Sequence, residues 1–147
     1  MHVTGIDRSV EALALAQRFG RVVQADIENA PWPLLVNGHP QPFDVVLVTH
    51  YLWRPLWPTL LHSLRPGGLL IYETFAHGNE RFGKPSRPEF LLAPGELLER
   101  CRNLHIVAFE QGLLDEPRRS VQRIVAQASS GEPWGAQQPA PEPLWLE

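Results

Sequence analysis

The chain has 147 residues, of which 44% are hydrophobic, and a formal net charge of -3. This length and composition allow one substantial hydrophobic core and exclude a fibrous or wholly disordered chain, so we expect a single globular domain. No run of lysine or arginine occurs, which disfavours nucleic acid as a partner. No apolar run approaches the roughly 20 residues that cross a bilayer, which disfavours a membrane location. One cysteine permits no internal disulfide, and the start lacks a secretory pattern, so we predict a cytoplasmic protein.

The beginning of the chain predicts a strand, a helix and a second strand. Residues 3–6 form a short apolar run, and Ser9 can cap a helix that stops at Gly20. Residues 21–25, "RVVQA", have the composition of a strand. The helix has apolar residues at Val10, Leu13, Ala14, Leu15 and Phe19.

The middle of the chain predicts a loop, a strand, a helix and a further strand. Five prolines and glycines between positions 31 and 42 indicate the loop. Residues 43–49, "FDVVLVT", are nearly all apolar, which is typical of a strand covered on both faces at the centre of a sheet. Pro55 suits the first turn of a helix that "RPGG" ends, and residues 69–75 follow as a strand. The apolar residues of this helix are Leu56, Trp57, Leu60, Leu61 and Leu64.

The last part predicts a short helix and an antiparallel hairpin. A segment rich in proline and glycine, 76–93, precedes a helix that starts at Pro94 and directs Leu97, Leu98 and Cys101 inward. Residues 104–110 and 120–127 both resemble strands, and the connection between them is too short for a crossover helix, so we expect them to pair antiparallel. Residues 129–147 contain four prolines and no periodicity, which predicts a flexible tail. Strands alternating with helices indicate an α/β sheet with ligands at the carboxyl ends of its strands.

Two acidic residues end the first two predicted strands. Asp7 follows the first strand, where a carboxylate can accept hydrogen bonds from both ribose hydroxyls. Asp26 follows the second strand, and two acids at one sheet edge favour a ligand that has a ribose and an amino-bearing base. Each aspartate also fits an ordinary structural role, as a helix cap or a turn residue.

Four segments resemble the class I S-adenosylmethionine (SAM) dependent methyltransferases. "VTGIDRS" resembles the second-strand motif of that family, and the resemblance implies that Asp7 binds the SAM ribose, with Arg8 also at the cofactor. "QADIENAPWPL" resembles the third-strand motif, in which Asp26 would receive the adenine amino group and Ile27 would pack near the ring. "FDVVLVTHYLWRPL" and "LRPGGLLIYETF" resemble the fourth strand with its loop and the fifth strand with its preceding turn.

The resemblance implies a Rossmann-like, mostly parallel sheet with helices on both faces and a C-terminal antiparallel hairpin. In the family's strand order, 3-2-1-4-5-7-6, the seventh strand lies antiparallel between the fifth and sixth. The resemblance covers Val3 to about Ala128. The run "YETFAHGNERFGKPSRPEFLLAPGELL" is similar to small bacterial methyltransferases of the tellurite-resistance type.

The sequence departs from the family at its start. Family members hold the methionine part of SAM against a glycine-rich loop after the first strand, and neither that strand nor that loop precedes Asp7. We hypothesise a shortened gene product or a misplaced start, which an in-frame glycine-rich motif in the upstream codons would support. If the 147-residue chain is the whole protein, we expect poor SAM affinity, and strands 2 and 4 would have unpaired backbone groups or a rearranged partner.

The loop after the fourth strand supplies the candidates for catalysis on a small-molecule acceptor. Thr49 could contact the methionine portion of SAM, and His50 could take a proton from the acceptor. Tyr51 and Trp53 could form an apolar pocket or lie over the sulfonium through a cation-π contact. We therefore predict His50 and Tyr51 as catalytic residues, although packing or capping would explain each of them as well.

Other site types and functions receive less support. "GNERFGK" at 78–84 fits the spacing of a phosphate-binding loop, but Pro85 follows where Ser or Thr is needed. The histidines are scattered, so we predict no metal site. Asp7 would also serve a nicotinamide-dependent oxidoreductase, and a non-catalytic remnant could bind a partner strand, for example in a homodimer, at the gap in the sheet.

Overall fold

A computed structural model of the chain describes residues 1–131. The chain divides into two compact units, Met1–Gln41 (unit 1) and Pro42–Glu147 (unit 2). Most of the predicted tail, residues 132–147, lies outside the described residues.

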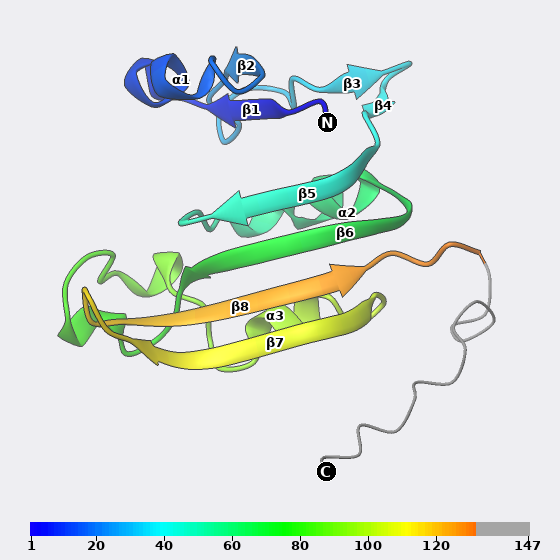
Figure 1. Cartoon of the computed structure of the whole chain (residues 1–147). Helices are drawn as coiled ribbons and strands as arrows, with labels where there is room; N and C mark the ends of the chain where they lie inside the picture. Colours follow the sequence, from blue (N-terminus) through cyan, green and yellow to red (C-terminus); the bar gives the residue numbers. More distant parts are fainter. Residues whose placement is uncertain (132–147) are drawn as a thin grey trace, which may run out of the picture. The chain divides into compact units, whose positions relative to one another are not determined.

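Unit 1 contains the expected strand, helix and strand (Figure 1). Strand β1 (Thr4–Asp7) and strand β2 (Arg21–Gln24) pair in parallel, and helix α1 (Val10–Ala16) connects them. The Ser9 side chain accepts a hydrogen bond from the backbone N–H of Ala12 at 3.2 Å, so the predicted cap is confirmed. A Cβ at Gly20 would lie 2.4 Å from the carbonyl oxygen of Val3, so the connection into β2 requires glycine there.

A small hairpin occupies the segment that we predicted as loop. Strands β3 (Leu35–Val36) and β4 (His39–Pro40) pair antiparallel. Between them Asn37 and Gly38 both have positive φ, 51° and 78°. An Asn-Gly pair favours this two-residue turn, so the sequence contained a signal for the hairpin.

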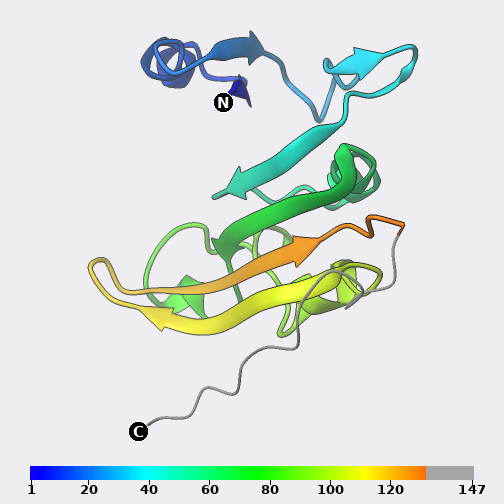
Figure 2. The same cartoon turned by 45° about the vertical axis from the view of Figure 1, so that its right-hand side comes forward.

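Unit 2 is built on a four-stranded sheet in the order β5-β6-β8-β7 (Figures 1 and 2). β5 and β6 are parallel, and β8 is antiparallel to both β6 and β7. This confirms the predicted C-terminal hairpin and the placement of the last strand between its two neighbours. The strands are β5 (Phe43–Thr49), β6 (Leu64–Phe75), β7 (His105–Leu114) and β8 (Arg119–Gln127).

Helices α2 and α3 pack against one face of this sheet (Figure 2). The Trp57 ring of α2 stacks on Tyr72 of β6, with ring centroids 4.8 Å apart. The backbone N–H of Leu97 in α3 donates to Gln122 Oε1 of β8 at 3.1 Å. The helical elements are η1 (Arg54–Leu56), α2 (Trp57–His62), η2 (Asn79–Arg81), η3 (Pro88–Phe90) and α3 (Glu96–Arg100).

Three local predictions were wrong. Within the described residues β5 is an edge strand of its sheet, and Val45 and Leu47 are 48% and 63% exposed, because β6 is the only strand that pairs with it. β6 begins at Leu64, which we placed in the preceding helix, so the "RPGG" segment belongs to the strand. Leu98 is exposed because the short helix α3 directs Leu97 and Cys101 toward the sheet.

The α/β fold class is confirmed. Parallel pairs occur in both units, and antiparallel pairing follows at the C-terminal hairpin. Within residues 1–131, every helix is too short or too polar to span a bilayer.

Candidate functional site

The carboxyl ends of β1 and β2 lie next to each other in unit 1. Their parallel register pairs Asp7 with Gln24, and the backbone N–H of Ala25 donates to the Asp7 carbonyl at 3.1 Å. Asp26 is the next residue. The backbone of unit 1 therefore brings the two predicted acidic residues to neighbouring strand ends.

Asp7 has a local structural contact and a free acceptor. Its Oδ1 accepts a hydrogen bond from the backbone N–H of Ser9 at 2.8 Å, which orders the turn into α1. Within the described residues its other oxygen has no hydrogen bond, and the residue is exposed. Because an ionised carboxylate can accept about four hydrogen bonds, Asp7 retains capacity for a ligand.

Asp26 organises the turn after β2. Its Oδ2 accepts from the Asn29 side chain at 2.9 Å, and its Oδ1 accepts from the backbone N–H of Glu28 at 3.2 Å. The Asn29 hydrogen bond contributes most to lowering the pKa of Asp26, with smaller contributions from backbone N–H groups and the charge of Arg8. Asp26 is therefore held as a carboxylate.

The other two cofactor candidates of unit 1 flank these acids. Arg8 lies beyond the end of β1, where its backbone carbonyl accepts from Gln24 Nε2 at 3.3 Å. Ile27 directly follows Asp26 and is half-buried. The structure thus brings Arg8 and Ile27 to the same strand ends as the two aspartates.

His50 follows β5 in unit 2 with an unusual backbone conformation. Its φ is 51°, and its backbone N–H donates to the Glu73 carbonyl of β6 at 2.9 Å. A non-glycine residue in this region costs about 1–3 kcal/mol and is often found where a side chain serves a function. Thr49, the last residue of β5, is exposed beside it.

A charged network lies beside the His50 ring. His50 Nε2 is 3.9 Å from Glu73 Oε1, and Arg123 Nε is 2.7 Å from Glu73 Oε2. The latter contact is an ion pair whose N–H is not aligned for a hydrogen bond, since Arg123 Nε has no hydrogen-bond acceptor. Glu110 lies 3.4 Å from the other side of Arg123. The Glu73 carboxylate thus lies between the His50 ring and the Arg123 guanidinium.

His50 opens into a cavity of about 410 Å³ in unit 2. The Phe75 ring lies at 5.2 Å from the His50 ring and tilted by 30°, and Phe82 and Lys84 line the cavity from the segment that follows β6. Arg118, from the turn between β7 and β8, lines it as well. Tyr51 and Trp53 are half-buried and do not line this cavity. Instead the Tyr51 carbonyl accepts a hydrogen bond from Tyr72 Oη at 2.6 Å.

The segment 77–91 forms a closed loop that carries one wall of the cavity. Ala76 and Leu92 form a parallel bridge, so the two ends of the loop meet. Inside it the buried Asn79 side chain donates to the Pro85 carbonyl at 3.0 Å and accepts from the Ser120 N–H at 3.2 Å. These bonds fix the loop against the start of β8.

The fold has close counterparts among solved structures. No protein-family profile matches the sequence, and no curated protein matches it either. TehB from Haemophilus influenzae superposes with a TM-score of 0.67 at 14% identity over 87% of this chain, which spans 50% of the TehB chain. The N-methyltransferase NodS from Bradyrhizobium japonicum gives 0.64 at 16% identity, over 87% of this chain and 74% of its own. A SAM-dependent methyltransferase from Methanosarcina mazei gives 0.62 at 16% identity, over 87% of this chain and 82% of its own.

The chain has the class I SAM-dependent methyltransferase fold. The sequence interpretation predicted a role for His50 and did not consider together with it three basic residues that line the same cavity. Lys84 was considered only as part of a phosphate-binding loop, and Arg118 and Arg119 only as part of a connection. The pair "RR" in a tight turn beside two strand ends was the available signal. Among residues 1–131, no three potential metal ligands gather.

Proposed function

We propose that the protein is a SAM-dependent methyltransferase that acts on a small-molecule acceptor in the cytoplasm, rather than on nucleic acid or at a membrane. The observation that carries this proposal is the pair of acidic strand ends in unit 1, on a fold shared with methyltransferases. Asp7 would accept hydrogen bonds from the ribose hydroxyls. Asp26 would accept from the adenine amino group.

The remaining cofactor contacts are proposed from the family resemblance. Ile27 offers an apolar side chain directly after Asp26, and Arg8 keeps a positive charge beside that carboxylate. Thr49 would contact the methionine portion. Since both aspartates retain acceptor capacity beyond their local hydrogen bonds, the residues present fit an adenosyl group.

We assign the acceptor chemistry to His50, with Tyr51 as a residue that positions its loop. SAM supplies a methyl group that is already activated on a sulfonium, so alignment contributes most of the rate. His50 would take the acceptor proton through its ring, with Glu73 stabilising the protonated imidazole at 3.9 Å. The half-buried Tyr51 would support the loop that holds His50, through its carbonyl bond to Tyr72.

A nuclear magnetic resonance titration with SAM and, separately, with NADH tests the proposal. We expect millimolar SAM to shift the amides of Asp7, Asp26 and Ile27 and to bind more tightly than NADH, which shares the adenosine part but also carries a diphosphate. Asp7→Asn and Asp26→Asn should each weaken SAM binding by about tenfold, because each loses a charge-assisted hydrogen bond. Asp44→Asn removes an exposed carboxylate from the start of β5 and should change nothing. Binding of NADH instead of SAM, or unchanged SAM binding in both variants, would contradict the proposal.

Strand addition at β5 is a second candidate function. Within the described residues β5 pairs along one edge only, and its exposed Val45 and Leu47 could pack against a partner. A second copy of the chain could supply that partner as a homodimer. Light scattering that shows an obligate dimer, together with no SAM binding, would favour this function over methyl transfer.

A further inference from the structure

The cavity beside His50 carries an excess of positive charge. Three basic residues and one acidic residue, Glu116, line it. Lys84 has no ion pair or hydrogen bond through its side chain within residues 1–131. Arg118 lies 3.9 Å from Asp115, but both side chains are largely exposed, so water screens this pair. The positive charge of the cavity is therefore largely uncompensated.

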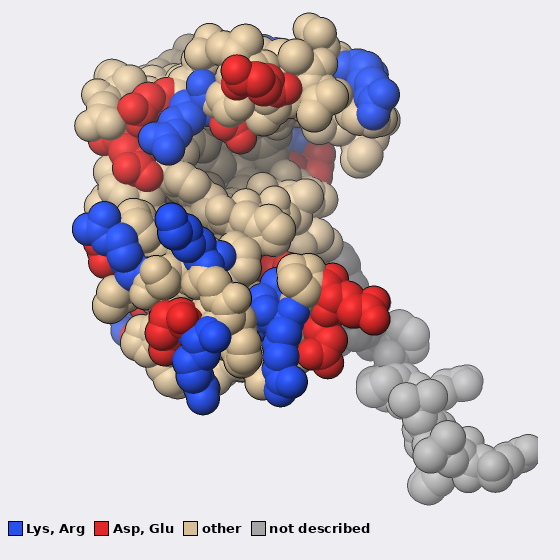
Figure 3. Space-filling model, turned by 90° about the vertical axis from the view of Figure 1, so that its left-hand side faces the viewer, with Lys and Arg blue, Asp and Glu red and all other residues tan. Residues whose placement is uncertain are grey.

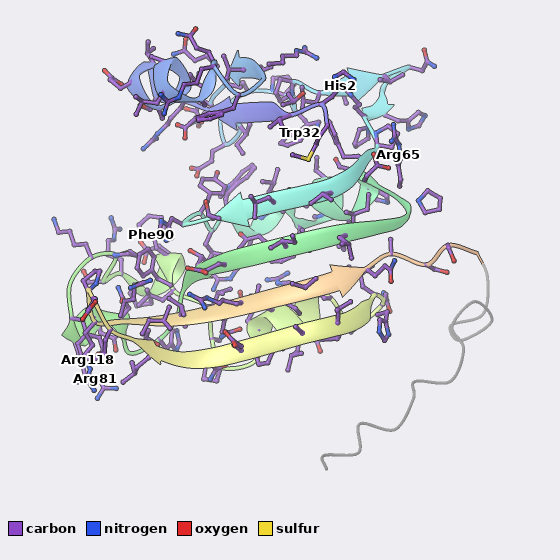
Figure 4. The ribbon with its side chains drawn as sticks, in the orientation of Figure 1. His2, Trp32, Arg65, Arg81, Phe90 and Arg118 are labelled. Carbon is purple, nitrogen blue, oxygen red and sulfur yellow. The ribbon has the colours of Figure 1, made fainter. Side chains whose placement is uncertain are left out.

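These cations come from two segments that the fold brings to one end of unit 2. Lys84 lies on the closed loop 77–91, and Arg118 and Arg119 lie at the turn between β7 and β8. Arg119 also donates to the Pro117 carbonyl at 2.9 Å, which holds it at the turn. Figure 3 views this end and shows basic side chains on its lower half, interspersed with acidic ones, and Figure 4 labels Arg118 and Arg81 there. A concave surface lined by one sign of charge concentrates ligands of the opposite sign.

The cavity also offers apolar contact area. Phe75 lies against His50, and Phe82 is 39% exposed on the cavity wall. The Arg118 guanidinium lies 5.6 Å from the centre of the Phe82 ring, so charged and aromatic surfaces adjoin. A volume of about 410 Å³ accommodates a small organic molecule and far exceeds a bare inorganic anion. An inorganic ion would leave both aromatic rings uncovered.

We propose that the methyl acceptor is an organic anion, whose charged group binds Lys84 and Arg118 and whose aromatic or apolar body packs against Phe75 and Phe82. This inference rests on the proposed methyltransferase function, because it assigns the cavity of His50 to the acceptor. The anionic group selects the substrate. The apolar body then directs another part of the molecule toward His50.

A titration with 2-naphthoate and its neutral counterpart 2-naphthamide tests this inference in the full chain. We expect naphthoate to bind at least about tenfold more tightly than naphthamide and to shift the signals of Gly83, His50 and the Arg118 side chain. The double variant K84Q/R118Q should weaken naphthoate by about tenfold and leave naphthamide unchanged. R65Q removes an exposed arginine from the start of β6 and serves as the matched control.

Equal affinity for the two probes, or no effect of K84Q/R118Q, would overturn the anionic acceptor. The SAM titration of the same samples separates the two proposals. If SAM binds and naphthoate has no preference over naphthamide, the acceptor inference fails and the methyltransferase function stands. If naphthoate is preferred and SAM does not bind, the cavity selects anions but the methyltransferase function fails, and with it the assignment of the cavity to an acceptor. Circular dichroism of the exposed-site variants confirms that they fold.

Discussion

The two parallel strand pairs among residues 1–131 differ in how deeply they bury the helix that connects their strands. In unit 1, α1 connects the paired strands β1 and β2. Only Leu13 of that helix is buried, and Leu15 is 70% exposed. In unit 2, α2 connects the paired strands β5 and β6. Its Leu60 is 4% exposed, and its Trp57 stacks on Tyr72. The helix starts also differ, since Ser9 caps α1 through its side chain and α2 has no side-chain cap but a proline in its first turn. The difference indicates that local sequence is enough to favour a parallel strand pair, whereas the packing of the connecting helix against the sheet determines how stable that unit is.

The largest expected effect comes from matched leucines of the two helices. Leu60→Ala should lower the free energy of unfolding by about 3 kcal/mol, because it leaves a cavity in the core of unit 2. Leu15→Ala in α1 should change it by less than about 0.5 kcal/mol, since that side chain is exposed. Urea denaturation followed by circular dichroism measures both. Equal losses would show that α1 is buried as deeply as α2 in solution.

Two arginines, one from each unit, extend the same comparison. Arg54 donates to Glu96 Oε1 at 3.0 Å and to the carbonyls of Glu89 and Leu91, so it joins η1 to the loop and α3. Arg54→Ala should lower the free energy of unfolding by about 2 kcal/mol, because the Glu96 carboxylate remains largely buried without its partner. Arg18→Ala in unit 1 removes only an exposed contact with Phe19 and should change the free energy of unfolding by less than about 0.5 kcal/mol. Thermal melts of the two variants provide the measurement, and similar shifts would refute the contrast.

The smallest expected effect on stability concerns the buried thiol of unit 2. Burial raises the pKa of the Cys101 thiol from 9.0 to about 11. The neutral thiol therefore stabilises the fold below pH 9, and this contribution is lost as the pH rises from 9.0 through about 11. At pH 8 a thiol reagent should label Cys101 only as fast as unit 2 opens. In a C101A background, A14C on the exposed side of α1 should react at once. Prompt labelling of native Cys101 would contradict its burial.

The sequence predicted the parts of the fold that local chemistry determines. Ser9 marked a cap, and the short connection between residues 110 and 120 predicted the antiparallel hairpin, whereas the helix predicted to stop at Gly20 already ends at Ala16. Burial was harder to predict, because it depends on which faces meet. The apolar run of β5 was read as central, yet Val45 and Leu47 remain exposed.

The candidate site divides in the same way. The positions of Asp7 and Asp26 were predictable because both follow neighbouring strands, and the position of His50 was predictable because it follows β5, while the roles of all three stay predictions. Lys84 and Arg118 could not be paired from the sequence, since 33 intervening residues fold back before the two line one cavity. They line one cavity because Asn79 hydrogen-bonds both Pro85 within the loop and Ser120 at the start of β8.

The bridge between Ala76 and Leu92 has an evolutionary consequence. A loop whose two ends already meet can be lengthened or exchanged with little disturbance of the sheet, because each doubling of loop length adds only about 0.6 kcal/mol of closure entropy. Phe82 and Lys84 lie on that loop. Substitutions or insertions in the closed loop 77–91 could therefore change ligand specificity during evolution, while the supporting strands remain unchanged.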